Sequence, residues 1–326
     1  MLFGHEFNRF VSAQASYMRP VAYINYHNIN GAPGTEHHHV RVNYGGVTLK
    51  ARAPIGARVS IYGEGGFGLT SRTGFKINGA PAVTDAHYSS VLAGGGIDYD
   101  LNRAWSLTGG VTYLPGKPGL DQPRTFFSSG GFRYTMRAIP QERVEANRRA
   151  GVVFPKQVIQ LEYSTGIGYA INDFVSTSVP IFWGGDVHVD SGVAPHYERN
   201  VFHTRKLFSL DAGASAGVYR TRDRKERFYT LSVYPLLRFT FLRTTPADVY
   251  FAYSLVGPTY ISNTMLDGLD TGHHFTFQDF MGLGVFAGKN RTLSVGVKIN
   301  HYSNGNVFTQ NAGVMIPLTF SVGYAF

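Results

Sequence analysis

The strongest constraint on the fold is a strict alternation of side chains at the end of the chain. From 316 to 326 every second residue is large and apolar, and these residues are Ile316, Leu318, Phe320, Val322, Tyr324 and Phe326. A β-strand places successive side chains on opposite faces, whereas a helix repeats about every 3.6 residues and cannot give this pattern. The other face is small or weakly polar and carries no charge, unlike the water-facing side of a soluble sandwich. The segment therefore predicts a strand of a closed, narrow barrel with lipid outside.

The same alternation recurs at 208–218, 229–241 and 248–255. The less apolar faces of these segments hold Asp211 and Arg238, which would be costly in a dry core but can pair in a polar barrel interior. Charged residues make up only 16 % of the chain, below the roughly 25 % of soluble domains. No apolar run is long enough for a membrane-spanning helix, and the many aromatic residues exclude a disordered chain. The predicted fold class is all-β, a transmembrane antiparallel β-barrel.

A net charge of +9 favours an anionic partner. Nucleic acid is not expected, because the sequence has no basic helical stripe and no nucleic-acid motif. One dense basic group lies between two predicted strands and contains Arg222, Arg224 and Lys225. It is either a solvated loop or a set of contacts to the phosphates of lipid head groups. The chain has no cysteine, which excludes disulfides, cysteine-ligated zinc and cysteine nucleophiles.

The second half of the chain predicts an eight-stranded unit, with strands at 158–170, 174–186, 204–219, 227–242, 247–260, 273–287, 291–303 and 314–326. Tight connections at 244–246 and 288–290 are predicted periplasmic turns, and the longer ones at 220–226, 261–272 and 304–313 are predicted extracellular loops. The connection 187–203 is long for a periplasmic turn. The first half predicts strands at 39–53, 58–75, 87–99, 104–115 and 124–137, with one or two more within 8–28.

A highly charged segment separates the two halves. Residues 138–157 include Pro140 and Pro155 and predict a linker that could contain a short helix. We therefore predict two tandem small barrels, one at 1–137 and one at 158–326; a single barrel of about 14–16 strands is the alternative. The chain begins without the charged and apolar regions of a signal peptide, and its first half has too few strands for an even-numbered barrel. We accordingly expect that the true N-terminus is missing.

The sharpest candidate for chemistry is the pair His301 and Ser303. Residues two apart on a strand share a face and can reach one another, which suits a serine nucleophile activated by a histidine base. The same face carries Leu293 and Val295, so the pair is predicted to point towards lipid. An enzyme that attacks an ester in a membrane lipid would place the pair there, and a water-filled channel would not. The other interpretation is a polar strand end at the membrane rim.

At these residues the sequence resembles the outer-membrane lipid A 3-O-deacylases of the PagL type. The resemblance covers about 158–326 and runs through Gly257–Ser262, Phe275–Asp279, Val295–Val297 and His301–Asn304. It implies an eight-stranded barrel in the bacterial outer membrane that removes an ester-linked acyl chain from the lipid A of lipopolysaccharide. It also implies that His301 is the general base and Ser303 the nucleophile, without a metal or another cofactor.

A departure from the family concerns the carboxylate that orients the histidine. The family has a Glu early in the last strand, and counting places that position at Met315 or Ile316, neither of which is acidic. A histidine base without this carboxylate loses its fixed tautomer, which can cost orders of magnitude in rate. Asp279 is the predicted substitute: with the hairpin centred near Lys289, it would lie opposite Ile299 and diagonal to His301.

Two further assignments complete the predicted site. Asn304, Gly305 or nearby backbone N–H groups are expected to contact the oxyanion. The alternative to an enzyme is a structural, adhesin-like or lipopolysaccharide-binding barrel that retains the motif as a remnant. A carboxylate beside His301 would argue against that alternative. The first half of the chain predicts no chemistry.

Overall fold

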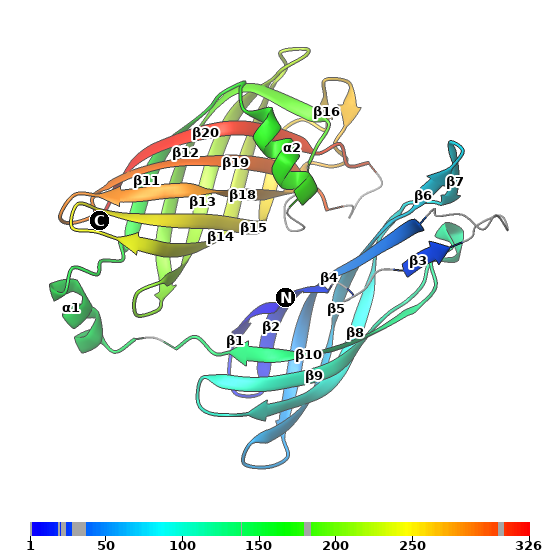
Figure 1. Cartoon of the computed structure of the whole chain (residues 1–326), viewed down its shortest axis with the longest axis horizontal. Helices are drawn as coiled ribbons and strands as arrows, with labels where there is room; N and C mark the ends of the chain where they lie inside the picture. Colours follow the sequence, from blue (N-terminus) through cyan, green and yellow to red (C-terminus); the bar gives the residue numbers. More distant parts are fainter. Residues whose placement is uncertain are drawn as a thin grey trace. The chain divides into compact units, whose positions relative to one another are not determined.

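The computed structural model describes residues 2–18, 20, 24–27, 37–137, 139–178, 184–305 and 310–326. The chain divides into two compact units, Met1–Thr135 and Met136–Phe326 (Figure 1). Within the described ranges, neither helix has the length and apolar character that a membrane-spanning helix needs. Both units are built from antiparallel β-strands, as the alternation predicts.

The C-terminal unit is a closed eight-stranded barrel. Each strand pairs antiparallel with the next, and β11 pairs with β20 to close the sheet. The short connections 204–207, 244–246 and 288–292 lie at one end, called the short-turn end, and the connections 165–186, 222–226, 262–274 and 304–313 lie at the other, called the long-loop end. The strands are β11 (Gln157–Ser164), β12 (Val187–His203), β13 (Phe208–Thr221), β14 (Arg227–Arg243), β15 (Ala247–Ile261), β18 (Phe275–Ala287), β19 (Leu293–Ser303) and β20 (Val314–Ala325).

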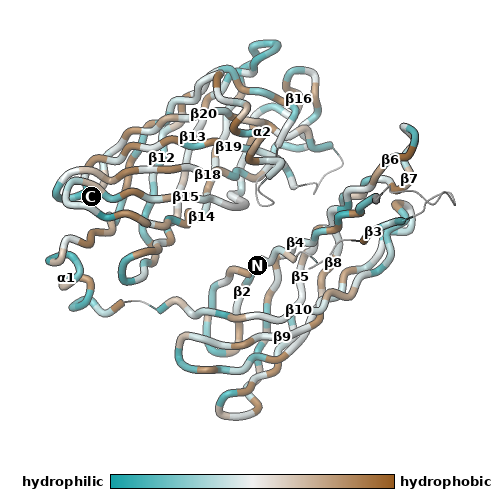
Figure 2. Tube along the Cα trace, in the orientation of Figure 1, coloured by the Kyte–Doolittle hydropathy of each residue, from teal (hydrophilic) through white to brown (hydrophobic). Residues whose placement is uncertain are grey.

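Polar side chains fill the middle of this barrel, as expected of a lumen enclosed by a lipid-facing wall. Arg238 pairs with both Asp211 and Glu198, which confirms the predicted partner of the buried guanidinium. A second group joins Glu162 to His196 and Lys298 at 2.8 and 2.5 Å. Apolar residues such as Leu231, Val233 and Phe320 are exposed on the outside. Figure 2 shows this alternation as apolar and polar residues following one another along the strands.

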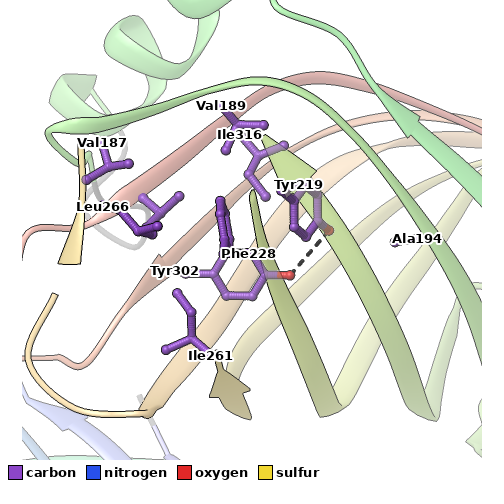
Figure 3. Close-up of a cluster of buried hydrophobic side chains, with 10 residues drawn as sticks. Val187, Val189, Ala194, Tyr219, Phe228, Ile261, Leu266, Tyr302 and Ile316 are labelled. Carbon is purple, nitrogen blue, oxygen red and sulfur yellow. Dashed lines mark hydrogen bonds between the residues drawn. The ribbon is translucent and has the colours of Figure 1, made fainter. Parts of the chain in front are cut away.

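Apolar side chains fill the long-loop end of the lumen (Figure 3). Tyr219 and Tyr302 approach within 3.4 Å through their hydroxyl groups at the centre of the cluster. In the described part of the barrel, the polar groups and this apolar plug together fill the lumen. The cluster consists of Val187, Val189, Ala194, Tyr219, Phe228, Ile261, Leu266, Tyr302, Val314 and Ile316.

The prediction around the second strand was wrong. The segment 174–186 was expected to be a strand, but its described part contains the end of helix α2 (Tyr169–Ser178), and residues 179–183 lie outside the described part. The expected connection 187–203 is β12 itself. Its alternation was hidden because the inward residues include His196 and Glu198 and the run contains Pro195. With β12 in place, the connection to β13 becomes a short turn, so all long connections lie at one end.

The N-terminal unit is an open sheet in the order β1-β2-β4-β5-β8-β9-β10, with β3 paired to β4. The predicted strands are present, and in the described residues they form an open sheet where a small barrel was predicted. Neighbouring strands are antiparallel throughout, so the edge strands β1 and β10 run in the same direction and cannot pair antiparallel with each other. The strands are β1 (Leu2–Glu6), β2 (Val11–Met18), β3 (Ile24–His27), β4 (His37–Pro54), β5 (Val59–Thr73), β8 (Ala86–Asp100), β9 (Trp105–Leu114) and β10 (Thr125–Tyr134).

Smaller elements complete the chain. The hairpin of β6 (Phe75–Ile77) and β7 (Ala80–Val83) joins β5 to β8, and β16 (Met265–Leu266) pairs with β17 (Leu269–Asp270) in the connection from β15 to β18. Helix α1 (Gln141–Arg149) lies in the predicted linker and starts after Pro140, which suits a helix start because proline lacks an N–H. The described strands within 8–28 are β2 and β3.

Candidate active site

The pairing of β18 with β19 brings the predicted site residues together. Asp279 lies directly opposite His301, and Phe277 lies opposite Ser303. The expected register, with Asp279 opposite Ile299, was therefore wrong by two residues. The turn 288–292 has positive φ at both Gly288 and Arg291, which centres the hairpin at residue 290 and not at Lys289. The correction places the carboxylate beside the imidazole instead of diagonal to it.

The inward side chains of the same strands fix this register from the lumen. Tyr302 lies opposite Gln278, whose Nε2 donates to the Tyr302 hydroxyl at 3.1 Å. The same hydroxyl lies 3.2 Å from the hydroxyl of Thr230 on β14. Because Tyr302 stands between His301 and Ser303 in the sequence, this buried network holds the backbone that carries both.

The outward side chains form the candidate site itself. His301 and Ser303 follow the alternation of Leu293 and Val295, whose side chains are exposed on the outside of the barrel. The Nδ1 atom of His301 lies 3.5 Å from the Oδ2 atom of Asp279. His301 has an exposed fraction of 0 % and Asp279 is also buried, whereas Ser303 is half-buried. The imidazole is thus covered, and the serine lies at the rim of the covered region.

An irregularity in β20 shapes the surroundings of His301. Lys298 pairs with Thr319 and Asn300 with Ile316, so β20 has one extra residue between these pairs, a β-bulge. Beyond it Met315 lies opposite His301, and Ile316 belongs to the apolar plug of the lumen. A family-type Glu at 315 would therefore stand beside the imidazole on β20, whereas Asp279 approaches it from β18.

A glycine makes room for the imidazole at the long-loop end. A Cβ atom at Gly313 would lie 2.9 Å from Nε2 of His301 and 3.0 Å from the carbonyl oxygen of Gly184. The backbone at 184–185 therefore passes close to the histidine. Any side chain at 313 would have to displace the imidazole or this backbone. The cover over His301 depends on that close approach.

Asn304 forms hydrogen bonds with two of the connections at the long-loop end. Its Nδ2 donates to the carbonyl oxygens of Thr271 and Gln310 at 3.1 and 2.5 Å, and its backbone N–H donates to Oδ1 of Asn311 at 2.8 Å. These donors are therefore engaged within the protein, which favours a role in ordering the 304–313 connection over the expected contact with an oxyanion. Gly305 has a φ of 63°, a conformation that glycine adopts without strain.

The predicted phosphate contacts lie at the long-loop end, which also carries Ser303. The guanidinium of Arg222 lies 5.4 Å from the ring centre of Tyr169, and Lys225 pairs with Asp190 at 3.3 Å. Arg224 donates its backbone N–H to Asp267 at 2.8 Å. The Arg224 guanidinium lies against Gly268, so the group is a structured loop in which all three side chains already have neighbours.

Asp267 ties two long loops together. It accepts hydrogen bonds from the Thr221 hydroxyl and from the backbone N–H groups of Asp223 and Arg224. Burial raises the pKa of Asp267, but these hydrogen bonds and the charge of Arg224 outweigh it and hold the pKa below its usual range. The ionised form of Asp267 therefore stabilises the long-loop end of the barrel.

Helix α2 was missed by the sequence analysis, although it borders the site. Asn172 is fully buried and donates to the carbonyl oxygen of Ile316, next to Met315 in β20. The apolar and β-branched residues of the helix resemble a strand in composition, which explains the error. The nearest signal was the break at Gly166 and Gly168, the second of which has a φ of 88°.

A closed antiparallel barrel with a polar lumen and an apolar outside defines the class of bacterial outer-membrane β-barrels. Residues 183–324 of this chain match the family model described as Lipid A 3-O-deacylase (PagL). The C-terminal barrel is therefore similar to the PagL family, and the protein is located in the bacterial outer membrane.

The chain also matches solved structures. The outer membrane enzyme PagL is 19 % identical, with 52 % of this chain and 98 % of that chain covered and a TM-score of 0.35. The beta domain of the Bordetella autotransporter BrkA is 11 % identical, with coverages of 97 % and 98 % and a TM-score of 0.24. An outer membrane channel from Pseudomonas putida F1 is 10 % identical, with coverages of 97 % and 94 % and a TM-score of 0.22. No curated protein matches the chain.

Proposed function

We propose that the C-terminal barrel is an outer-membrane hydrolase that removes an ester-linked acyl chain from lipid A. The family match supports the substrate class. The observation that carries the proposal is the Asp279 carboxylate, which lies 3.5 Å from His301. His301 in turn precedes Ser303 by two residues on the outward-facing side of β19. An inactive barrel that only keeps the motif would not need a carboxylate beside this histidine.

In the proposed reaction, the Oγ atom of Ser303 attacks the ester carbonyl carbon and His301 takes its proton. The tetrahedral intermediate collapses, and the sugar oxygen leaves with the proton that His301 returns. Water then attacks the acyl-serine ester, again giving a proton to His301, and the fatty acid is released as Ser303 recovers its hydrogen. The oxyanion contact is assigned to backbone N–H groups near Gly305, because the donors of Asn304 are engaged elsewhere.

Asp279 has a positioning role in this mechanism. A carboxylate facing Nδ1 favours the tautomer with a proton on that atom, which leaves Nε2 to accept the serine proton. It also stabilises the imidazolium that forms after proton transfer. Burial of both groups strengthens this interaction, because the dielectric around them is low. Asp279 thereby replaces the Glu that position 315 lacks.

The basic loop is proposed to bind the phosphates of the lipid A head group. Arg222, Arg224 and Lys225 belong to the connection between β13 and β14 at the same end of the barrel as Ser303. Arginine and lysine near a phosphate form charge-assisted hydrogen bonds. This contact would place the sugar of the substrate at the rim and its acyl chains along the barrel wall.

The second candidate is a non-catalytic barrel that binds lipopolysaccharide. Met315 in place of an acidic residue and the complete burial of His301 favour it. Under this hypothesis the basic loop would still bind phosphates, but lipid A would remain intact. The two hypotheses therefore differ in whether lipid A loses an acyl chain.

The test is incubation of the purified full-length protein with lipid A in mixed micelles, followed by mass spectrometry. We expect the loss of one hydroxyacyl chain with the parent protein and no loss with Ser303→Ala. Chain loss that persists in Ser303→Ala would refute the assignment. Intact lipid A with the parent protein would favour the binding protein.

A further inference from the structure

Helix α2 presents an apolar edge to its surroundings on the outside of the barrel. Ile167, Ile171 and Phe174 are exposed, and Phe174 has an exposed fraction of 68 %. Ile171 and Phe174 are three residues apart and form one stripe along the helix, and Ile167 lies just before the helix, on the other side of Gly168. The neighbouring Asp173 and Thr177 are also exposed and form a polar stripe. A short helix with separate apolar and polar edges is typical of a membrane interface.

The apolar edge continues the outer apolar surface of the barrel. Tyr163 on β11 pairs with Phe320 on β20, and both are exposed. The ladder then extends beyond β11, because Thr165 donates its N–H to the carbonyl of Leu318, and Leu318 donates to the carbonyl of Ile167. The exposed side chains of Tyr163 and Phe320 therefore lead to Ile167 and α2, with the half-buried Thr165 and Leu318 between them. A hydrocarbon layer that covers the wall at Tyr163 and Phe320 would therefore have α2 as its neighbour.

The inner side of α2 is fixed against the strand that borders the candidate site. Asn172 donates to the carbonyl of Ile316, one residue from Met315, which lies opposite His301. Tyr169 packs edge to face against His188 at 4.6 Å, and His188 pairs with Met315. Figure 1 shows α2 beside β20, with which it is in contact. The helix is thus attached one strand away from the proposed base.

We propose that the apolar edge of α2 lies in the hydrocarbon layer and contacts the acyl chains of the lipid that the site hydrolyses. The second part rests on the proposed function. Acyl chains that approach Ser303 from the outer leaflet lie against the barrel wall on the side where α2 is attached. Ile171 and Phe174 would then act as a specificity surface that favours long acyl chains over short ones.

The first test measures the position of α2 without relying on activity. Because the chain contains no cysteine, single variants Ile171→Cys, Phe174→Cys and Asp173→Cys can each carry one nitroxide spin label. In bilayers of lipid A and phospholipid, we expect labels at 171 and 174 to collide more with oxygen than with a water-soluble nickel complex. We expect the reverse at 173. Equal accessibility to nickel at 173 and 174 would overturn the proposal.

The second test measures acyl-chain contact. Phe174→Ser should raise the KM for lipid A about 10-fold, because an apolar contact of one aromatic side chain is lost. The matched variant Asp173→Ser should stay within about 2-fold of the parent. An unchanged KM in Phe174→Ser would overturn the acyl contact. If the parent protein does not hydrolyse lipid A, the proposed function fails, and the spin-label result alone decides whether α2 lies in hydrocarbon.

Discussion

Both units of this protein bring a serine and a histidine close together, but the two pairs differ in placement and surroundings. Ser71 and His87 face each other on the neighbouring strands β5 and β8, whereas His301 and Ser303 are two residues apart on β19. In the N-terminal sheet the Ser71 hydroxyl lies 3.0 Å from Nδ1 of His87, and this histidine is exposed. In the C-terminal barrel His301 is fully buried and faces a buried carboxylate. A contact between serine and histidine is therefore not sufficient to define a catalytic site. An oriented and desolvated histidine distinguishes the second pair from the first.

The carboxylates near the two histidines also have different tasks. Asp85 accepts a hydrogen bond from the backbone N–H of Gly74 and so holds the end of β5. Asp279 lies directly across from His301 in the strand register. The position of a carboxylate relative to the strand pairing thus decides whether it can orient an imidazole.

The largest effect is expected from removing the base. His301→Ala should lower lipid A hydrolysis by about 1,000-fold or more, because the serine then has no group to accept its proton. His87→Ala should leave the rate within about 2-fold. Both rates can be measured by mass spectrometry of lipid A over time. Equal losses in the two variants would show that the difference in surroundings has no consequence for activity.

The next effect concerns the carboxylate. Asp279→Asn should lower kcat about 100-fold, because the histidine loses its preferred tautomer and the stabilisation of its charged form. Asp85→Asn serves as the matched change in the other unit and should not affect kcat. In the Asp279→Asn background, Met315→Glu should recover at least about 10-fold, since residue 315 lies opposite His301. A further loss in the double variant would contradict the positioning role.

A smaller effect is expected at the glycine that borders His301. Gly313→Ala should lower kcat about 10-fold, because the new Cβ would lie 2.9 Å from Nε2 and must displace the imidazole or the backbone at 184–185. A Cβ added at Gly131 on β10 would meet no other atom within 4 Å, so Gly131→Ala is the control. The unfolding temperature of both variants would show whether folding is intact. Unchanged kcat in Gly313→Ala would contradict the close approach to the imidazole.

The smallest effect concerns the loops at the long-loop end. The hydrogen bonds from Thr221 and two backbone N–H groups hold the pKa of Asp267 below its usual range of about 3.8, although burial opposes them. A lowered pKa in the folded state gives stability that is present above the unfolded pKa and is lost as the pH falls through the folded pKa. Asp267→Asn should therefore unfold slightly more easily at neutral pH. The difference from the parent protein should vanish in strong acid, as measured by thermal unfolding at several pH values.

Much of the fold follows from the sequence, because lipid outside and a narrow lumen inside impose an alternation that is visible in single strands. The segments 227–242 and 247–260 were predicted nearly as they occur in β14 and β15. The alternation does not encode closure: the N-terminal strands follow it equally well and form an open sheet. It also failed at β12, where Pro195 lies on the outward face and the inward face carries His196 and Glu198.

The candidate site was predicted in part. His301 and Ser303 were found by their spacing, but the cover over His301 depends on Gly313 and on the backbone at 184–185, which is far away in the sequence. The partner of Asp279 depended on the turn geometry at Gly288 and Arg291, which shifts the register by two residues. Such long-range and register effects depend on backbone conformation, which the residue pattern does not determine.

The most direct measurement is labelling of the full-length protein in mixed micelles with a serine-reactive fluorophosphonate, followed by peptide mapping. The probe reacts with a serine whose hydroxyl is activated by a base. We expect the label on Ser303, its loss in His301→Ala, and no label on Ser71. A label on Ser71, or an unlabelled Ser303, would contradict the proposed active site.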